Sequence, residues 1–120
     1  MRKTILVVED DAAIGEVLQL MLSDAGYAVE IQMDGQAALQ MAEPFPDLLF
    51  LDIRLSGTDG RAICQHLKGK PATRHIPIIL LSAQKETQGM VKDAGADDFL
   101  AKPFEMEEVL ALVAHYLGGG

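Results

Sequence analysis

Short runs of apolar residues alternate along this chain with longer stretches in which apolar residues recur at helical spacing. The short runs, rich in Val, Ile, Leu and Phe, are typical of buried strands and span 4–9, 28–32, 47–52, 76–82 and 98–101. Amphipathic stretches that predict helices cover 11–24, 35–43, 60–69, 85–94 and 105–117. Because strands and helices alternate, the pattern predicts an α/β fold with a parallel sheet, right-handed crossovers and helices on both faces.

Capping and turn residues support these boundaries. Gly26 and Gly95 follow the first and fourth predicted helices, where a C-terminal cap favours a residue that tolerates positive φ. Asp34 and Asp59 precede the second and third helices, where their side chains can accept the first N–H groups. The helix at 85–94 has the least support, because Gly89 in its middle costs about 1 kcal/mol relative to alanine.

Composition and charge limit the classes of function. The chain has 120 residues, of which 49% are hydrophobic and 23% charged, so we expect one globular domain over 1–117 with a flexible glycine tail at 118–120. The formal net charge of −8 argues against direct binding to nucleic acid or to an anionic membrane. No apolar run approaches the ~20 residues of a membrane span. The first run also meets acidic residues too early for a signal peptide, so we expect a cytoplasmic location.

Polar groups that can carry chemistry gather where the predicted strands end. The apolar run 48–51 ends in a lone carboxylate, Asp52, which would be costly to bury without partners. In an open parallel sheet, ligands bind beyond the carboxyl ends of the strands. The ends of four different strands supply Glu9, Asp10, Asp11, Asp52, Ser82 and Lys102. We therefore place Asp52 at the mouth of the sheet, not in its core.

Together these groups predict a site for a metal ion and a phosphoryl group. Clustered carboxylates repel one another and must take up protons or bind a cation. Oxygen ligands with room for water suit Mg²⁺ better than zinc, and Asp10 and Asp52, with Glu9 nearby, are the candidates. Lys102 can neutralise an incoming phosphoryl group, and Ser82 can donate a hydrogen bond to it. The set therefore suits a carboxylate nucleophile that accepts a phosphoryl group.

Each of these residues also has an ordinary structural explanation. Asp11 opens the first predicted helix, so we expect it to be an N-cap or an outer member of the site. A lone lysine is most often solvated at the surface, and a lone serine most often bonds the local backbone. Because such groups occur together at the same ends of four strands, a shared metal and phosphoryl site is favoured over these separate explanations.

In order and spacing, the motifs resemble those of the receiver domain of bacterial two-component response regulators. The matching segments run through the whole chain and read ILVVEDD, DLLFLDIRLSGTDG, IPIILLSA and AGADDFLAKPF. The resemblance implies a flavodoxin-like receiver fold with strand order 2-1-3-4-5. It also implies a phosphoacceptor signalling switch that catalyses its own phosphorylation and slow dephosphorylation, and not an enzyme that turns over an external substrate.

The resemblance assigns roles to the matching residues. Asp52 would accept the phosphoryl group from a histidine kinase or a histidine phosphotransfer protein. The ligands of Mg²⁺ would be Glu9, Asp10, Asp52 and the backbone carbonyl of Arg54. Glu9 would act directly or through water. Lys102 would pair with Asp52 or with its phosphoryl group.

Two further positions, Ser82 and Phe99, match the family's switch pair. Ser82 would move to donate to a phosphoryl oxygen, and the Phe99 ring would turn into the space that this leaves. The face formed by 85–94, 98–101 and 105–117 would then bind an output domain or partner differently, or drive dimerisation. A cis peptide before Pro103 would aim Lys102 inward. Alternatively, Phe99 is an ordinary aromatic residue of the core with no role in switching.

Departures from the family's pattern affect the loop after the phosphoacceptor. Relatives usually have proline at the position of Ser56 and often methionine at that of Thr58, so this loop is expected to be more mobile. Arg54 and Gln84 lie two residues after Asp52 and Ser82, where side chains can approach the attacking water. We expect both to influence the lifetime of the phosphoryl group.

Two other functions compete with the switch. A receiver-like module that binds partners without phosphorylation would not need the complete acidic set and Lys102. A phosphatase with an aspartyl nucleophile commonly places a second acid two residues further on, where this chain has Arg54. The residues therefore favour the phosphoacceptor switch over both alternatives.

Overall fold

Five strands of the computed structural model, which describes residues 2–55, 57–82 and 94–118, form one parallel sheet. Its order is β2-β1-β3-β6-β7, with neighbouring strands parallel throughout. In that order the strands are Ala28–Gln32, Thr4–Val8, Leu48–Asp52, Ile78–Ser82 and Asp98–Ala101. The predicted order 2-1-3-4-5 is therefore confirmed, since β4 and β5 form a separate hairpin.

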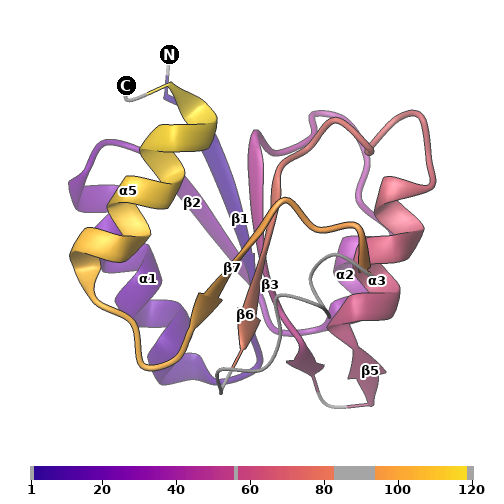
Figure 1. Cartoon of the computed structure of the whole chain (residues 1–120), viewed down its shortest axis with the longest axis horizontal. Coiled ribbons are helices and arrows are strands. Elements are labelled where there is room, and N and C mark those ends of the chain that lie inside the picture. The colour runs from indigo at the N-terminus through magenta and orange to yellow at the C-terminus, as the bar shows by residue number, and fades with distance from the viewer. Residues whose placement is uncertain (1, 56, 83–93, 119–120) are drawn as a thin grey trace.

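Helices cover both faces of the sheet, as Figure 1 shows. On one face lie α1 (Ala12–Asp24) and α5 (Met106–Leu117), and on the other lie α2 (Gly35–Leu39) and α3 (Gly60–Lys68). Each face has its own apolar core. The α1–α5 core includes Leu18, Leu22, Phe50, Val109 and Val113. The α2–α3 core includes Leu51, Ile63, Leu67, Ile78 and Leu80. Both faces of the central strands are thus buried, which explains their continuous apolar runs.

Side-chain caps fix where three of the helices begin. Asp11 accepts hydrogen bonds from the backbone N–H groups of Ala13 and Ile14 at 3.0 and 3.3 Å. Asp34 and Asp59 cap α2 and α3 in the same way, with donor distances of 2.9 and 2.8 Å. The expected N-caps are therefore confirmed. Gly26 and Gly95 have φ values of 103° and 81°, the positive φ that was expected at both positions.

The second helix is shorter than predicted. It ends at Leu39, whereas the periodicity predicted a helix over 35–43. Pro44 disfavours a helical conformation at the residue before it, and Pro46 follows, so the chain returns to β3 through a loop. The Glu43–Pro44 peptide bond is cis, which the sequence had not indicated. The helix predicted at 85–94, including Gly89, falls almost entirely outside the described residues.

A short hairpin between β3 and α3 was not predicted. Its strands are β4 (Arg54–Leu55) and β5 (Thr58–Asp59), paired antiparallel. Gly57 lies in the turn with φ of 73°, a conformation that other residues rarely adopt. The Ser56-Gly57 dipeptide is a turn signal, so sequence alone could have indicated this hairpin. The hairpin lies directly beyond the carboxyl end of β3, where Asp52 is the last residue.

No helix in the described ranges is long and apolar enough to cross a membrane.

Candidate functional site

Strand geometry places the key charged side chains on one side of the sheet. Residues two apart along a strand face the same side. Three residues of three different strands pack in the α1–α5 core, namely Val7, Phe50 and Leu100. Two positions further along the chain from each come Glu9, Asp52 and Lys102. The parallel register of β1, β3, β6 and β7 brings the ends of these strands to one edge, on the side covered by α1 and α5.

At this edge the lysine bridges two carboxylates. The Nζ atom of Lys102 lies 2.7 Å from Oε1 of Glu9 and 3.2 Å from Oδ2 of Asp52. Oδ1 of Asp52 accepts a hydrogen bond of 3.2 Å from the backbone N–H of Arg54. Asp52 is 5% exposed, so it is more deeply covered than its expected place at the mouth of the sheet suggests. Its ammonium and N–H partners offset the cost of this burial.

Three acidic residues can share one cation. Glu9, Asp10 and Asp52 each offer a carboxylate oxygen, and these oxygens all lie within 4.8 Å of one another. Asp10 is half-buried, whereas Glu9 is fully buried. A compact set of oxygen donors fits a hard divalent cation and does not fit zinc, which prefers nitrogen and sulfur. Arg54, whose backbone carbonyl was predicted as a ligand, opens β4 immediately beyond this cluster.

The buried charges change the proton affinities at the site. Burial raises the pKa of Glu9 to about 7, helped by a hydrogen bond shared with Asp52 and opposed by Lys102 and the N–H of Asp11. Burial acts to lower the pKa of Lys102, but the hydrogen bond with Glu9 and the charges of Asp52 and Glu9 outweigh it, so that pKa is raised. The lysine therefore stays charged near neutral pH. The Glu9–Lys102 contact itself was not predicted from the sequence.

Phe99 packs against the α2–α3 core, and strand alternation assigns Ser82 to the same side of the sheet. Leu80 packs in the α2–α3 core, Phe99 pairs with it in register, and Ser82 follows two positions later. Ser82 is 5% exposed, and Phe99 is half-buried against that core. The backbone N–H of Lys102 donates to the carbonyl oxygen of Ser82 at 2.6 Å, which ties the ends of β6 and β7 together. Gln84 lies outside the described residues.

With this geometry in place, comparison with known proteins decides the family. The family model described as "Response regulator receiver domain" matches residues 5–114. The chain belongs to this family. Receiver domains use a divalent metal at an acidic cluster, and the cluster of Glu9, Asp10 and Asp52 has the expected composition. They partner with histidine kinases and with output domains.

Relatives of this receiver domain include regulators of transcription. It is 46% identical over 110 residues to response regulator MprA of Mycobacterium tuberculosis, matching 89% of this chain and 47% of that protein. It is 40% identical over 116 residues to the phosphate regulon transcriptional regulatory protein PhoB of Escherichia coli, matching 94% of this chain and 51% of that protein. The chain thus spans about half the length of the curated relatives it matches.

Solved structures agree with the receiver fold. A response regulator structure from Chloroflexus aurantiacus superposes with a TM-score of 0.92 at 38% identity, covering 98% of this chain and 99% of that chain. The receiver domain of sensor histidine kinase PA1611 from Pseudomonas aeruginosa gives 0.87 at 33% identity, with coverages of 98% and 99%. A magnesium ion is coordinated in the active-site cleft of that second protein.

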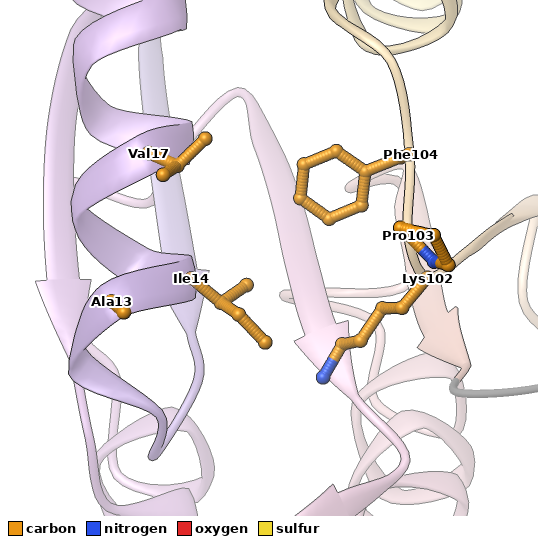
Figure 2. A pocket seen from close by; sticks show the side chains of 6 residues that line it. All are labelled: Ala13, Ile14, Val17, Lys102, Pro103 and Phe104. Carbon is orange, nitrogen blue, oxygen red and sulfur yellow. The ribbon is translucent and has the colours of Figure 1, made fainter.

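A mostly apolar cavity of about 400 Å³ opens beside the charged groups of the receiver domain. Its lining residues come from α1 and from the segment after β7, and are Ala13, Ile14, Val17, Lys102, Pro103 and Phe104. Figure 2 shows the Phe104 ring facing Ile14 and Val17, while the Lys102 ammonium points away from the ring. The Lys102–Pro103 peptide bond is cis. The helical periodicity over 11–24 did not indicate this cavity, since it does not show that Val17, one of the apolar residues of α1, is 44% exposed.

Replacing Lys102 is expected to destabilise the receiver domain. In Lys102→Met the fully buried Glu9 and the nearly buried Asp52 would face each other without a counter-ion. Breaking a buried pair by removing one partner commonly costs about 3–5 kcal/mol, and partial exposure of the lysine reduces this to about 2 kcal/mol here. Urea unfolding at neutral pH without divalent cations measures the loss.

Two controls accompany this measurement. Millimolar Mg²⁺ should restore more stability to Lys102→Met than it adds to the native protein, because a bound cation takes over the neutralising role. The exposed Lys3, replaced by Met, should leave stability within about 0.5 kcal/mol of the native value. Equal stabilities of Lys102→Met and Lys3→Met would contradict an energetic role for the Lys102 ion pairs.

Proposed function

We propose that this receiver domain is a phosphoacceptor switch in which Asp52 takes a phosphoryl group from a histidine kinase or a histidine phosphotransfer protein. The observation that carries the proposal is the placement of Asp52. Its carboxylate ends β3, lies 3.2 Å from the Lys102 ammonium and belongs to the cluster with Glu9 and Asp10. A nucleophilic oxygen beside a fixed positive charge is what phosphoryl transfer requires.

The acidic cluster is proposed to bind Mg²⁺. The ligands would be Glu9, Asp10, Asp52 and the backbone carbonyl of Arg54, with Glu9 binding directly or through water. When bound, Mg²⁺ would neutralise negative charge on the transferring phosphoryl group. Support comes from the oxygen-only donor set within 4.8 Å and from the magnesium ion in the related receiver domain of Pseudomonas aeruginosa.

In the proposed transfer step an oxygen of Asp52 attacks the phosphorus of the donor's phosphohistidine. The new O–P bond forms as the P–N bond breaks, and the bonding electron pair stays on the histidine nitrogen. Lys102 then pairs with the phosphoryl oxygens, which compete with Glu9 for its ammonium. The cavity lined by Ile14, Val17 and Phe104 lies next to this ammonium and offers apolar contact to the donor.

We propose that the conformational response to phosphorylation begins at Ser82 and Phe99. Ser82 would donate to a phosphoryl oxygen, and the half-buried Phe99 ring would move into the space that this leaves. The face that includes β7 and α5 would then bind an output domain, a partner or a second copy differently. Arg54 and Gln84 are proposed to tune the lifetime of the phosphoryl group.

We do not propose that this domain turns over an external substrate. Arg54 stands two residues after the nucleophile, where an aspartyl phosphatase needs a general acid, so the domain would only phosphorylate itself and lose the group slowly. Direct binding of nucleic acid by this domain is not part of the proposal, because its net charge is −8. We also propose a cytoplasmic location, on the basis of the sequence pattern alone.

Incubation with a small phosphodonor tests the proposed function. The native protein, mixed with acetyl phosphate and millimolar Mg²⁺, is expected to gain one phosphoryl group, which intact-mass spectrometry detects. Excess EDTA should suppress the gain, because the carboxylate cluster then lacks the cation that offsets its charge. A native protein that keeps its original mass under these conditions would leave phosphorylation-independent partner binding as the better description.

A further inference from the structure

Positive charge is concentrated on one loop of this otherwise acidic domain. From Gly60 to Ser82 the chain contains no aspartate or glutamate, although the whole sequence has 18 of them. The same stretch exposes four basic or titratable side chains near the end of α3 and in the loop that leads to β6. These residues, here called the basic loop surface, are His66, Lys70, Arg74 and His75.

Internal hydrogen bonds hold this loop in one conformation. The carbonyl oxygen of Lys70 accepts from the backbone N–H groups of Thr73 and Arg74 at 3.2 and 2.9 Å. The buried hydroxyl of Thr73 donates to the carbonyl oxygen of Leu67 at 2.6 Å. The ammonium of Lys68, in the last turn of α3, also donates to the carbonyl oxygens of Arg74 and Ile76, at 3.1 and 2.7 Å. A ligand that binds such a preorganised loop loses little affinity to ordering it.

The charges of the basic loop surface are available for an external partner. Lys68 is neutralised by Asp97, at 2.7 Å, and Arg61 by Asp59, at 2.8 Å. Within the ranges 2–55, 57–82 and 94–118, by contrast, neither Lys70 nor Arg74 takes part in an ion pair. An incoming carboxylate can therefore pair with these side chains without displacing an internal partner.

This surface lies away from Asp52, at the end of the sheet where the strands begin. In Figure 1 the connection from α3 to β6 is at the top, the end at which both chain termini are marked. Contacts link it to the end of α5, since the Tyr116 hydroxyl donates to the carbonyl oxygen of Asp97 at 2.9 Å and Asp97 binds Lys68. A ligand on this loop would leave the carboxyl end of β3 open to a phosphodonor.

We propose that the basic loop surface binds an acidic segment of a partner protein. A short segment brings a few carboxylates that Lys70 and Arg74 can pair with at contact distance, where the distant negative charges of the domain are screened by salt. Single-stranded nucleic acid is a poorer match, because residues 60–82 include no Phe, Tyr or Trp, the large aromatic side chains on which bases stack best. A membrane is a poorer match too, since Pro71 and Ala72 are the only apolar residues exposed in the loop.

Fluorescence anisotropy with a labelled polyglutamate peptide tests this inference at about 0.1 M salt, where a Debye length of about 10 Å screens the distant acidic residues. The double variant Lys70→Glu/Arg74→Glu should bind the peptide about tenfold more weakly than the native protein, or worse. The matched control Arg2→Glu/Lys3→Glu makes the same change in net charge at two exposed residues before β1, and should stay within about twofold of the native affinity. Circular dichroism confirms that each variant is folded. Should the reversal variant not fold, Lys70→Gln/Arg74→Gln replaces it, with an expected loss of about threefold.

Three results would overturn the inference. The first is no measurable binding of the peptide by the native protein. The second is an equal loss in the control variant, which would mean that only the overall field of the domain matters. The third is tighter binding to a labelled single-stranded oligonucleotide of matched charge, or to phosphatidylserine vesicles, than to the peptide. None of these outcomes bears on phosphorylation of Asp52, which is measured separately by mass.

Discussion

The Asp52→Asn protein is expected to gain no phosphoryl group from acetyl phosphate in the presence of Mg²⁺. The amide has the same shape as the carboxylate, so the fold should persist, but it is neutral and is a poor nucleophile. It also contributes no negative charge to the cluster with Glu9 and Asp10. Intact-mass spectrometry of the native and variant proteins, treated side by side, measures the difference.

A second aspartate provides the matched control for this experiment. Asp59 is exposed and serves as the N-cap of α3, a role that asparagine fills about equally well. The Asp59→Asn protein should therefore be phosphorylated to the same extent as the native protein. An equal mass gain by Asp52→Asn would mean that another residue accepts the phosphoryl group, and the proposed function would then be wrong.

A methyl group at Gly60 is expected to cost about 3 kcal/mol or more of unfolding free energy. The α-carbon of this glycine packs against the backbone of the phosphoacceptor strand. A Cβ there would overlap the carbonyl oxygen of Asp52 and would lie 2.8 Å from its carbonyl carbon and 2.9 Å from the Cα of Ile53. The backbone N–H of Gly60 also donates to the carbonyl oxygen of Ile53 at 2.8 Å, so the two segments cannot separate freely. Urea or thermal unfolding of Gly60→Ala measures the effect.

Gly69→Ala is the control for the Gly60 prediction. A Cβ at Gly69, the C-cap of α3, would lie 3.3 Å from the carbonyl oxygen of Gln65 and 3.5 Å from that of His66, which small shifts accommodate. We expect its stability to stay within about 1 kcal/mol of the native value. If Gly60→Ala were as stable as Gly69→Ala, the close approach of Gly60 to the backbone of Asp52 and Ile53 would impose no energetic constraint, and the prediction would be wrong.

Much of this architecture could be predicted because short local patterns in the sequence determine where strands and helices form. Continuous apolar runs mark strands buried on both faces, and Asp11, Asp34 and Asp59 mark helix starts through side-chain capping. The carboxyl ends of parallel strands must share an edge, so Asp10, Asp52 and Lys102 could be expected to gather there before any coordinates were known.

What could not be predicted depends on which side of the sheet each residue faces. In a run such as Leu48 to Leu51 both faces are apolar, so the pattern does not show which face Asp52 will join. The pairing of Glu9 with Lys102 depends on that choice. The cavity beside Phe104 depends on the packing of α1 against the segment after β7, which no local pattern encodes.

The sheet itself divides this domain into two compartments with different tasks. Glu9, Asp52 and Lys102 meet under α1 and α5, whereas Ser82 and Phe99 face the layer of α2 and α3. Substitutions on the α2–α3 side, around Phe99, can therefore accumulate without touching the ion pairs that Lys102 makes with Glu9 and Asp52. Such a division lets copies of a receiver gene diverge on one side of the sheet while the charged cluster on the other side is kept.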